Sequence, residues 1–236
     1  MSTRALLLAG GLGTRLRPIT ETVPKCLVPV GGRPMLDYWI DALERAGIAE
    51  ALINTHHLPD PVRAYMDHIN TTRTVTLTEV FEPELLGSAG TVTANRAFAE
   101  GADQIVVIYA DNLSDISLGA LVDFHRTHPD SMTMALFHTP YPEKCGIAAL
   151  DDQNLITAFV EKPEHPQSDL ANAGLYVLDA AAWCEIADMK AFDFGFDVIP
   201  AFVGRMRGYT HTGYHRDIGT HDSLAQAEVD VAGLFS

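Results

Sequence analysis

A glycine-rich segment near the N-terminus carries residues suited to binding an anion. It reads Leu8-Ala9-Gly10-Gly11-Leu12-Gly13-Thr14-Arg15 and follows a short apolar run. Its three glycines allow the backbone to approach a ligand closely, and turned backbone N–H groups in such a loop form an anion-binding concavity. The guanidinium of Arg15 can donate two hydrogen bonds to one phosphate. The segment therefore predicts a phosphate site, with a plain tight turn as the alternative.

Two common phosphate-binding motifs do not fit this segment. A dinucleotide fingerprint that begins at Gly11 requires glycine at position 16, which is Leu16. A P-loop requires Gly-Lys-Ser or Gly-Lys-Thr, and neither follows. Further along, Lys25 lies between Pro24 and Pro29, which favours a fixed backbone and a binding role over a solvated surface lysine.

Two separated aspartates are candidates for holding a cation. Asp111 comes just after the apolar run Gln104–Tyr109, and Asp217 lies in Arg216-Asp217-Ile218-Gly219-Thr220. Ligand sites in parallel sheets lie at the carboxyl ends of strands, and carboxylates there can hold a hard cation such as Mg²⁺. The alternative for each aspartate is a turn residue.

The glycine segment continues into a longer pattern that resembles a known family. The runs GGLGTRLRPIT (10–20) and PKCLVPVGGRPML (24–36) resemble the opening signature of the sugar-1-phosphate nucleotidyltransferases. This resemblance implies that the glycine loop wraps a nucleoside triphosphate, and that Arg15 and Lys25 contact its phosphates. It implies catalytic roles for Arg15, Lys25 and Asp111. The nucleotide-binding residues it implies in this region are Leu8, Ala9, Gly10, Gly11, Gly13 and Thr14.

The segment Glu82–Gly90 resembles the part of guanylyl- and related transferases that borders the nucleobase. This copy departs from the family pattern, because Glu84 and Leu85 are inserted and Ser88 replaces threonine. The resemblance implies that Glu82, Leu86, Gly87, Ser88 and Ala89 bind nucleotide.

Later segments resemble the sugar-binding part of the same family. Phe159-Val160-Glu161-Lys162-Pro163 resembles its FxEKP segment, and Asn172-Ala173-Gly174-Leu175-Tyr176 resembles its NxGxY segment. A surface charge pair is the alternative for Glu161 and Lys162. The substrate-binding residues that the resemblance implies are Asn112, Gly146, Glu161, Lys162, Asn172 and Gly174.

The resemblance also implies a divalent metal, held by Asp111 and Asp217. We expect Mg²⁺, with Mn²⁺ as the alternative. The ten histidines and three cysteines do not predict a structural zinc site, because such sites use two tight ligand pairs. Cys26, beside Lys25, has no partner pattern for a nucleophile, so we interpret it as a small packed side chain.

The hydrophobic patterning predicts the strands and helices that must position these residues. Apolar runs predict strands at Arg4–Leu8, Ala51–Thr55, Thr74–Val80, Gln104–Tyr109, Met132–His138, Gly146–Leu150, Leu155–Val160, Gly174–Leu178 and Met206–Thr212. Helical spacing predicts helices at Pro34–Ala46, Pro61–Ile69, Ser88–Phe98, Leu118–Arg126, Ala180–Ala187 and Thr220–Ala232.

The alternation of strand and helix over the first 140 residues predicts an α/β fold. We expect a Rossmann-like mixed, mostly parallel sheet with helices on both faces, as in the nucleotide-diphospho-sugar transferase fold. The chain predicts one nucleotidyltransferase domain over 1–236, with a nucleotide-binding half (1–140) and a sugar-phosphate-binding half (141–236).

The composition narrows the classes of partner that we expect this chain to bind. A net charge of −15 argues against binding nucleic acid or an anionic membrane. Three widely spaced cysteines favour a reducing, cytoplasmic setting, and the apolar run Ala5–Ala9 is too short for a signal peptide or a membrane span. Family members are often dimers, so a homodimer is compatible with the resemblance.

The hypothesis is an enzyme that joins a nucleoside triphosphate to a sugar 1-phosphate and releases pyrophosphate. GTP with a mannose-like or heptose 1-phosphate is the first choice, and uridylyl or thymidylyl transfer to another sugar 1-phosphate is the alternative. Two rivals are a non-catalytic relative that binds nucleotide sugars and a glycosyltransferase. The second rival usually has a DxD motif, whereas this chain has Asp111-Asn112-Leu113.

Overall fold

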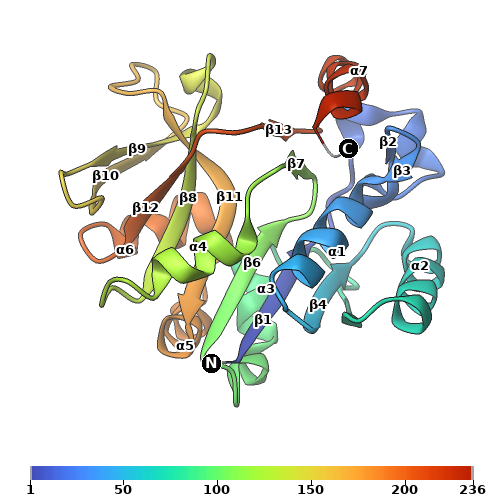
Figure 1. The fold of residues 1–236 in the computed structure, drawn as a ribbon, viewed down its shortest axis with the longest axis horizontal. Helices are drawn as coiled ribbons and strands as arrows, with labels where there is room; N and C mark the ends of the chain where they lie inside the picture. Colours follow the sequence, from blue (N-terminus) through green and yellow to red (C-terminus); the bar gives the residue numbers. More distant parts are fainter. Residues whose placement is uncertain (1, 235–236) are drawn as a thin grey trace. The chain divides into compact units, whose positions relative to one another are not determined.

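The computed structural model describes residues 2–234, and they form two compact units (Figure 1). Unit 1 contains residues 2–3, 86–107 and 120–212. Unit 2 contains residues 4–85, 108–119 and 213–234. Among the helices of the described chain, none is long and apolar enough to cross a membrane.

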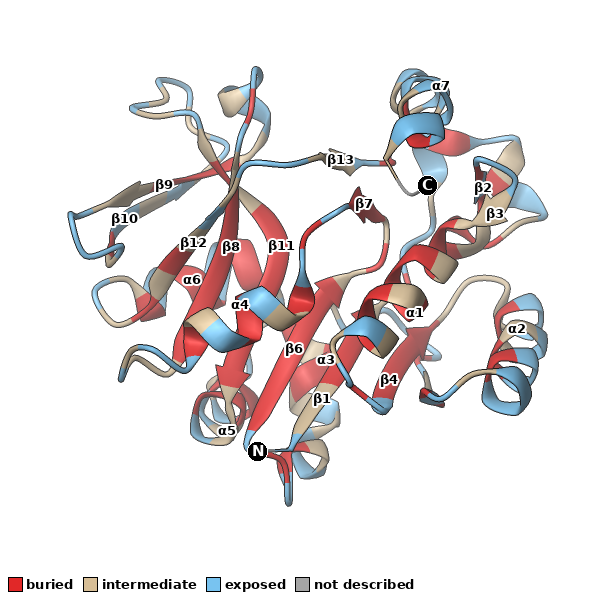
Figure 2. Ribbon diagram, viewed as in Figure 1, coloured by how far each residue is buried: buried red, intermediate tan, exposed pale blue. Residues whose placement is uncertain are grey.

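Unit 2 is built on parallel strands. β1 (Thr3–Leu8) pairs with β4 (Glu50–Thr55), and β4 pairs with β5 (Thr76–Phe81), both in parallel. β6 (Gln104–Tyr109) lies next to β1 and has residues in both units. The middle of β1, β4 and β6 is apolar and buried, as the red stretches of their ribbons show (Figure 2). The strands thus deliver their carboxyl ends, with the loops that follow, to one edge.

Two helices of unit 2 follow the strand–helix alternation. α1 (Met35–Arg45) buries Met35, Leu36, Trp39, Ile40 and Leu43, which are spaced as an apolar helix face requires. α2 (Pro59–Thr72) begins with proline at its first position, where the missing N–H costs nothing, and buries Val62, Met66 and Ile69.

Unit 2 also contains short strand pairs. β2 (Pro29–Val30) pairs with β3 (Arg33–Pro34), and β7 (Asn112–Ser114) pairs antiparallel with β13 (His215–Asp217). The final helix, α7 (His221–Asp230), begins after Thr220, whose Oγ1 accepts a hydrogen bond from the N–H of Ser223 at 3.2 Å. Thr220 is therefore the N-cap of α7. Val30, Met35, Tyr38, Leu113, Ile218, Ala227 and Val231 form one buried cluster that joins these elements.

Unit 1 contains the antiparallel part of the fold. β11 (Leu170–Asp179) pairs with β8 (Met132–His138) and β9 (Gly146–Leu150), and β9 pairs with β10 (Ile156–Glu161), all antiparallel. β12 (Arg207–His211) pairs with β8 in parallel. The hydrogen-bonded order in this unit is β10-β9-β11-β6, with β8 branching from β11 and β12 pairing with β8.

The helices of unit 1 include α3 (Ser88–Ala94), α5 (Ala180–Met189) and α6 (Ile199–Phe202), while α4 (Leu118–His125) begins in unit 2. A π-helical turn at Phe194–Val198 precedes α6. The expected helix Ser88–Phe98 is wrong at its end. Asn95 leaves helical geometry and its Nδ2 donates to the carbonyl of Thr91, so α3 stops at Ala94 and a 3₁₀ turn follows at Arg96–Ala99.

The predicted fold class is confirmed: the chain has a mixed, mostly parallel α/β architecture, with its parallel strands concentrated in unit 2.

Candidate active site

The short pairing of β7 with β13 brings Asp111 and Asp217 together. Asp217 lies opposite Asn112 in this ladder, and the N–H of Ile218 donates to the carbonyl of Asp111 at 3.0 Å. Asp111 therefore lies beside the end of β13, although it is 106 positions before Asp217 in the sequence. Trp39 stabilises this segment, since its buried Nε1 donates to the carbonyl of Asn112 at 2.8 Å.

Lys25 lies between the two carboxylates. Its Nζ is 2.6 Å from Oδ2 of Asp111 and 3.7 Å from Oδ1 of Asp217. The lysine side chain is only 9% exposed, so the alternative of a solvated surface lysine is excluded. It begins a 3₁₀ turn, Lys25–Leu27, after Pro24. Burial and the charge of Asp111 raise the pKa of the neighbouring Cys26 thiol to about 12, which makes it a packed side chain and not a nucleophile at neutral pH.

Arg15 reaches the same cluster from the glycine-rich segment. One of its guanidinium nitrogens, Nη2, is 3.8 Å from Oδ2 of Asp217, and its side chain is two-thirds exposed. Partial desolvation and the charge of Asp111 raise the pKa of Asp217, while Lys25 and Arg15 oppose that shift. Two carboxylates and two cationic side chains thus lie in one cluster of unit 2, at the end of the glycine loop. They belong to Asp111, Asp217, Lys25 and Arg15.

The glycine-rich segment has a fixed shape. Gly13 has a φ of 62°, and a Cβ there would lie 2.8 Å from Cγ2 of Thr20. The hydroxyl of Thr20 donates to the carbonyl of Gly13 at 2.7 Å. Only glycine satisfies both the left-handed backbone and this close approach. In the same segment Gly11, Thr14 and Arg15 are exposed, Leu8, Ala9 and Gly13 are half-buried, and Gly10 is buried.

Asn54 is a functional candidate that the sequence analysis missed. Its Oδ1 accepts hydrogen bonds from the N–H of Ala9 at 2.6 Å and of Gly10 at 3.1 Å. Its Nδ2 donates to Oε1 of the buried Glu82 at 3.1 Å. Asn54 therefore ties the start of the glycine loop to Glu82. The available signal was an amide side chain directly after the apolar run Ala51–Ile53, near the carboxyl end of β4.

A divalent metal fits the donor set in unit 2. Asp111 and Asp217 supply carboxylate oxygens, which Mg²⁺ prefers, and Mg²⁺ commonly takes one or two carboxylates and completes its shell with water and phosphate. Burial is the main reason that the pKa of Asp217 is raised, and the nearby carboxylate of Asp111 adds to the shift. Within residues 2–234, no group of three or more His, Cys, Asp or Glu side chains is arranged to hold a metal. A two-carboxylate site that relies on a ligand is the arrangement that fits.

The predicted nucleobase segment divides between the two units. Glu82 lies in unit 2, whereas Leu86, Gly87, Ser88 and Ala89 lie in unit 1 at the start of α3. The N–H of Ala89 donates to the carbonyl of Phe192 at 3.0 Å. Ser88 donates its hydroxyl to Oδ2 of Asp193 at 3.2 Å and accepts from the N–H of Phe194 at 2.9 Å.

The predicted sugar-binding residues lie in unit 1, apart from Asn112. Glu161 is the last residue of β10 and pairs with Gly146, the first residue of β9. Its carboxylate is half-buried, and Nζ of Lys162 is 3.7 Å from its Oε1. Burial, with a smaller contribution from Asp193, raises the pKa of Glu161 despite Lys162. Asn172 accepts from the N–H of Gly174 at 2.9 Å and donates to the hydroxyl of Tyr176 at 2.7 Å.

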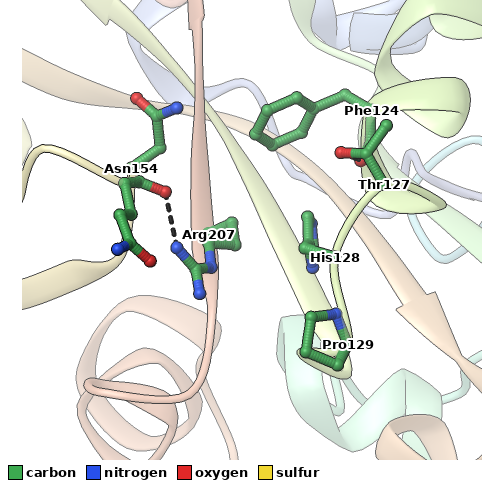
Figure 3. Close-up of a pocket in the computed structure, with 7 residues that line it drawn as sticks. Phe124, Thr127, His128, Pro129, Asn154 and Arg207 are labelled. Carbon is green, nitrogen blue, oxygen red and sulfur yellow. Dashed lines mark hydrogen bonds between the residues drawn. The ribbon is translucent and has the colours of Figure 1, made fainter.

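A separate cavity of about 340 Å³ lies in unit 1 (Figure 3). The ring of Phe124 and Thr127, His128 and Pro129 form one side, and Arg207 lies opposite (Figure 3). Nε of Arg207 donates to Oδ2 of Asp130, and its Nη1 donates to the carbonyl of Gln153, each at 2.5 Å. None of the residues predicted to bind nucleotide, sugar or metal lines this cavity in the described chain.

Comparisons with known proteins show the family of the chain. A family model described as nucleotidyl transferase matches residues 4–233. A mannose-1-phosphate guanyltransferase from Debaryomyces hansenii is 33% identical over 221 residues, which cover 92% of this chain and 61% of that protein. A mannose-1-phosphate guanylyltransferase from Mycobacterium tuberculosis is 31% identical and is covered to 64%. The chain thus spans less than two thirds of these curated relatives.

A solved structure covers the whole chain. It is the crystal structure of a candidate glucose-1-phosphate thymidylyltransferase from Bacillus anthracis, in complex with sucrose. It superimposes with a TM-score of 0.89 at 26% identity, and the match covers 100% of this chain and 97% of that one.

Proposed function

We propose that this chain, which belongs to the nucleotidyl transferase family over residues 4–233, joins a nucleoside triphosphate to a sugar 1-phosphate and releases pyrophosphate. The observation that carries the proposal is the cluster of Lys25, Asp111, Asp217 and Arg15 beside the glycine loop. A transfer of this kind needs positioned phosphates and neutralised charge more than a covalent nucleophile, and this cluster supplies both.

The glycine loop and Arg15 act on the triphosphate. Asn54 accepts from the N–H groups of Ala9 and Gly10 and so holds the start of the loop, while the backbone of the exposed Gly11 and of Gly13 remains to contact the phosphates. The exposed guanidinium of Arg15 donates to the departing pyrophosphate and stabilises its charge. Lys25 contacts the α-phosphate, where negative charge develops during attack.

Asp111 and Asp217 would hold a divalent metal, for which Mg²⁺ is the first candidate and Mn²⁺ the second. When bound, such an ion supplies charge neutralisation and a template for the phosphate oxygens. Lys25 contributes at the same place by balancing the two carboxylates before substrate arrives.

The residues of unit 1 bind the second substrate. Glu161 accepts hydrogen bonds from sugar hydroxyls, and a half-buried carboxylate is suited to this because its remaining acceptor capacity faces little competing water. Lys162, exposed beside it, neutralises the incoming 1-phosphate. Asn172 and Gly174 border the sugar, and Asn112 in unit 2 is assigned to the same substrate.

GTP with mannose 1-phosphate, or a heptose 1-phosphate, is our first assignment. Two relatives named as mannose-1-phosphate guanylyl- or guanyltransferases support it, together with the Glu82–Gly90 segment. Uridylyl or thymidylyl transfer is the second assignment, and the Bacillus anthracis structure favours it. A non-catalytic nucleotide-sugar-binding protein is the remaining alternative. The chain would act in solution with these small molecules, without nucleic acid or membrane, in a cytoplasmic setting.

One assay tests the proposal. GTP, ATP, UTP and dTTP are each mixed with mannose, heptose and glucose 1-phosphates in Mg²⁺, and pyrophosphate release is measured. We expect release that requires both substrates, fastest with GTP, because a site that bonds one base leaves buried polar groups unpaired with another. Faster release with UTP or dTTP would replace the guanylyl assignment. No release with any pair would contradict the enzyme and leave the binding protein.

A further inference from the structure

The turn Asp193–Gly195 lies beside two of the predicted substrate-binding segments of unit 1. Its conformation is fixed by its own carboxylates. Oδ1 of Asp193 accepts from the N–H of Gly195 at 2.8 Å and of Phe196 at 3.1 Å, and so begins the π-helical turn. Oδ2 of Asp197 accepts from the N–H of Phe192 at 2.9 Å and of Asp193 at 2.8 Å, which lowers the pKa of Asp197.

On one side the turn contacts the segment predicted to border the nucleobase. The hydroxyl of Ser88 donates to Oδ2 of Asp193, and the N–H of Phe194 donates back to that hydroxyl. Gly87, with a φ of 77°, packs against Phe192 so closely that a Cβ would lie 2.3 Å from its carbonyl oxygen. Hydrogen bonds and close packing therefore connect the start of α3 to the turn.

On the other side the turn contacts the carboxylate predicted to bind the sugar. A Cβ on Gly195 would lie 2.8 Å from Oε2 of Glu161, a distance that real Cβ atoms do not show. A Cβ on Gly146 would lie 2.5 Å from the same oxygen. Glu161 thus occupies a slot between two glycines, one on β9 and one in the turn.

The backbone of Gly195 does not itself require glycine. Its φ lies outside the left-handed region, so alanine is compatible with the local conformation. The constraint at this position comes from Glu161, and to a lesser degree from Oδ1 of Asp193, which would be 3.2 Å from the added atom. A missing side chain that is explained mainly by the neighbouring carboxylate of Glu161 points to a role through that carboxylate.

We propose that Asp193 and Gly195 are positioning residues for the sugar 1-phosphate: Asp193 shapes the turn, and Gly195, by lacking a side chain, leaves the slot in which Glu161 meets the sugar hydroxyls. This inference rests on the proposed function. It adds that the orientation of Glu161, and not only its charge, determines how well the second substrate binds. Because Asp193 also holds Ser88, its loss affects both substrates, whereas a change at Gly195 affects the sugar phosphate alone.

The test compares Gly195→Ala with Gly119→Ala. Gly119 is the matched control, because a Cβ there would make only an ordinary contact, with Oγ of Ser117 at 3.9 Å. We expect Gly195→Ala to raise KM for the sugar 1-phosphate by at least about fivefold with KM for the triphosphate within about twofold. Gly119→Ala should change neither. Combined with Glu161→Gln, Gly195→Ala should cause little further loss, since both act through one carboxylate. An unchanged KM for the sugar 1-phosphate, or losses that simply multiply, would overturn the proposal.

Asp193→Ala provides a second variant that adds no atoms, should Gly195→Ala fail to fold. It should raise KM for both substrates, because Ser88 and Gly195 lose their shared partner. Asp193→Asn, which keeps an oxygen for the N–H of Gly195, should recover most of the binding. Equal effects of Asp193→Ala and Asp193→Asn would contradict a role through these hydrogen bonds.

A readout without catalysis separates this inference from the proposed function. The titration of the Glu161 carboxyl carbon is followed by NMR in the wild type and in Gly195→Ala. We expect the displaced carboxylate of Gly195→Ala to be better hydrated, so the pKa of Glu161 falls toward its ordinary value, while Lys162 and Asp193 remain the charges that face it. An unchanged pKa would refute the positioning role. If the wild-type chain releases no pyrophosphate, the proposed function fails, and this titration still decides whether Gly195 orients Glu161.

Discussion

Nζ of Lys25 lies 2.6 Å from Oδ2 of Asp111, and this pair is part of the charged cluster of unit 2. The lysine is almost fully buried, while about one third of the aspartate side chain is exposed. An ammonium in this place balances the carboxylates of Asp111 and Asp217 when no other cation is present. It also competes with a metal for the same oxygen atoms.

Replacement of Lys25 by methionine should therefore separate two effects of the lysine, its competition with the metal and its stabilisation of the α-phosphate. In Lys25→Met, Mg²⁺ should bind more tightly in the absence of nucleotide than it does to the wild type, because the competing ammonium is gone. Turnover should fall by at least about a hundredfold, because the α-phosphate loses its cation. Isothermal titration calorimetry with Mg²⁺ alone and pyrophosphate release measure the two effects.

Lys190→Met is the control, since Lys190 is an exposed lysine at the end of α5. It should leave Mg²⁺ binding and turnover at wild-type values. Weaker Mg²⁺ binding by Lys25→Met than by the wild type would show that the lysine does not oppose the metal.

Arg15→Lys should lower kcat/KM by roughly tenfold or more. Lysine keeps the charge near Asp217 but cannot donate two parallel hydrogen bonds to a phosphate. The neighbouring exposed Arg17 supplies the matched change, and Arg17→Lys should stay within about twofold of the wild type. Steady-state kinetics with saturating sugar 1-phosphate make the comparison. Equal activity of Arg15→Lys and the wild type would show that Arg15 does not bind a phosphate through two parallel hydrogen bonds.

His125 makes stability depend on pH in unit 1. Burial, with the nearby His128, lowers the pKa of His125 from 6.5 to about 4. Between these values the unfolded chain binds a proton that the folded chain does not. The free energy of unfolding is therefore unaffected by this group above pH 6.5. It decreases as pH falls from 6.5 toward 4, by up to about 3 kcal/mol.

His125→Asn tests this dependence while keeping a polar group near Oγ1 of Thr133, which lies 2.9 Å from Nδ1 of His125. Urea unfolding at pH 7 and pH 4.5 should show a smaller loss of stability in the variant than in the wild type. Identical losses in the two proteins would mean that His125 does not contribute.

The parallel part of the fold was predictable from local pattern. The run Gln104–Tyr109 matches β6 residue for residue, because a continuous apolar run bounded by polar residues has few other ways to be buried. Arg4–Leu8 and Ala51–Thr55 likewise fall within β1 and β4. Asp111 was placed correctly at the end of β6, since the carboxyl ends of such strands are where ligand-binding residues collect.

The features that complete the candidate site could not be read from local pattern. β7 and β13 have three residues each, too few for a recognisable period, and only their long-range pairing joins Asp111 to Asp217. Asn54 and Asp193 act through backbone N–H groups that are distant or irregular, so their roles follow from tertiary contacts. The functions predicted for Arg15, Lys25 and Glu161 stay predictions, which the variants above test.

Turnover of Asp111→Asn, Asp217→Asn and the double variant tests the central claim most directly, namely that the chain transfers a nucleotidyl group with one metal shared by these aspartates. Pyrophosphate release is measured in saturating Mg²⁺ with the best substrate pair. Each single change should remove most turnover, and the double variant should lose little more, because either change disables the same ion. Circular dichroism should show folded protein throughout, since each change reduces repulsion between two close carboxylates. Wild-type turnover in either single variant, or losses that multiply in the double variant, would contradict the shared metal site.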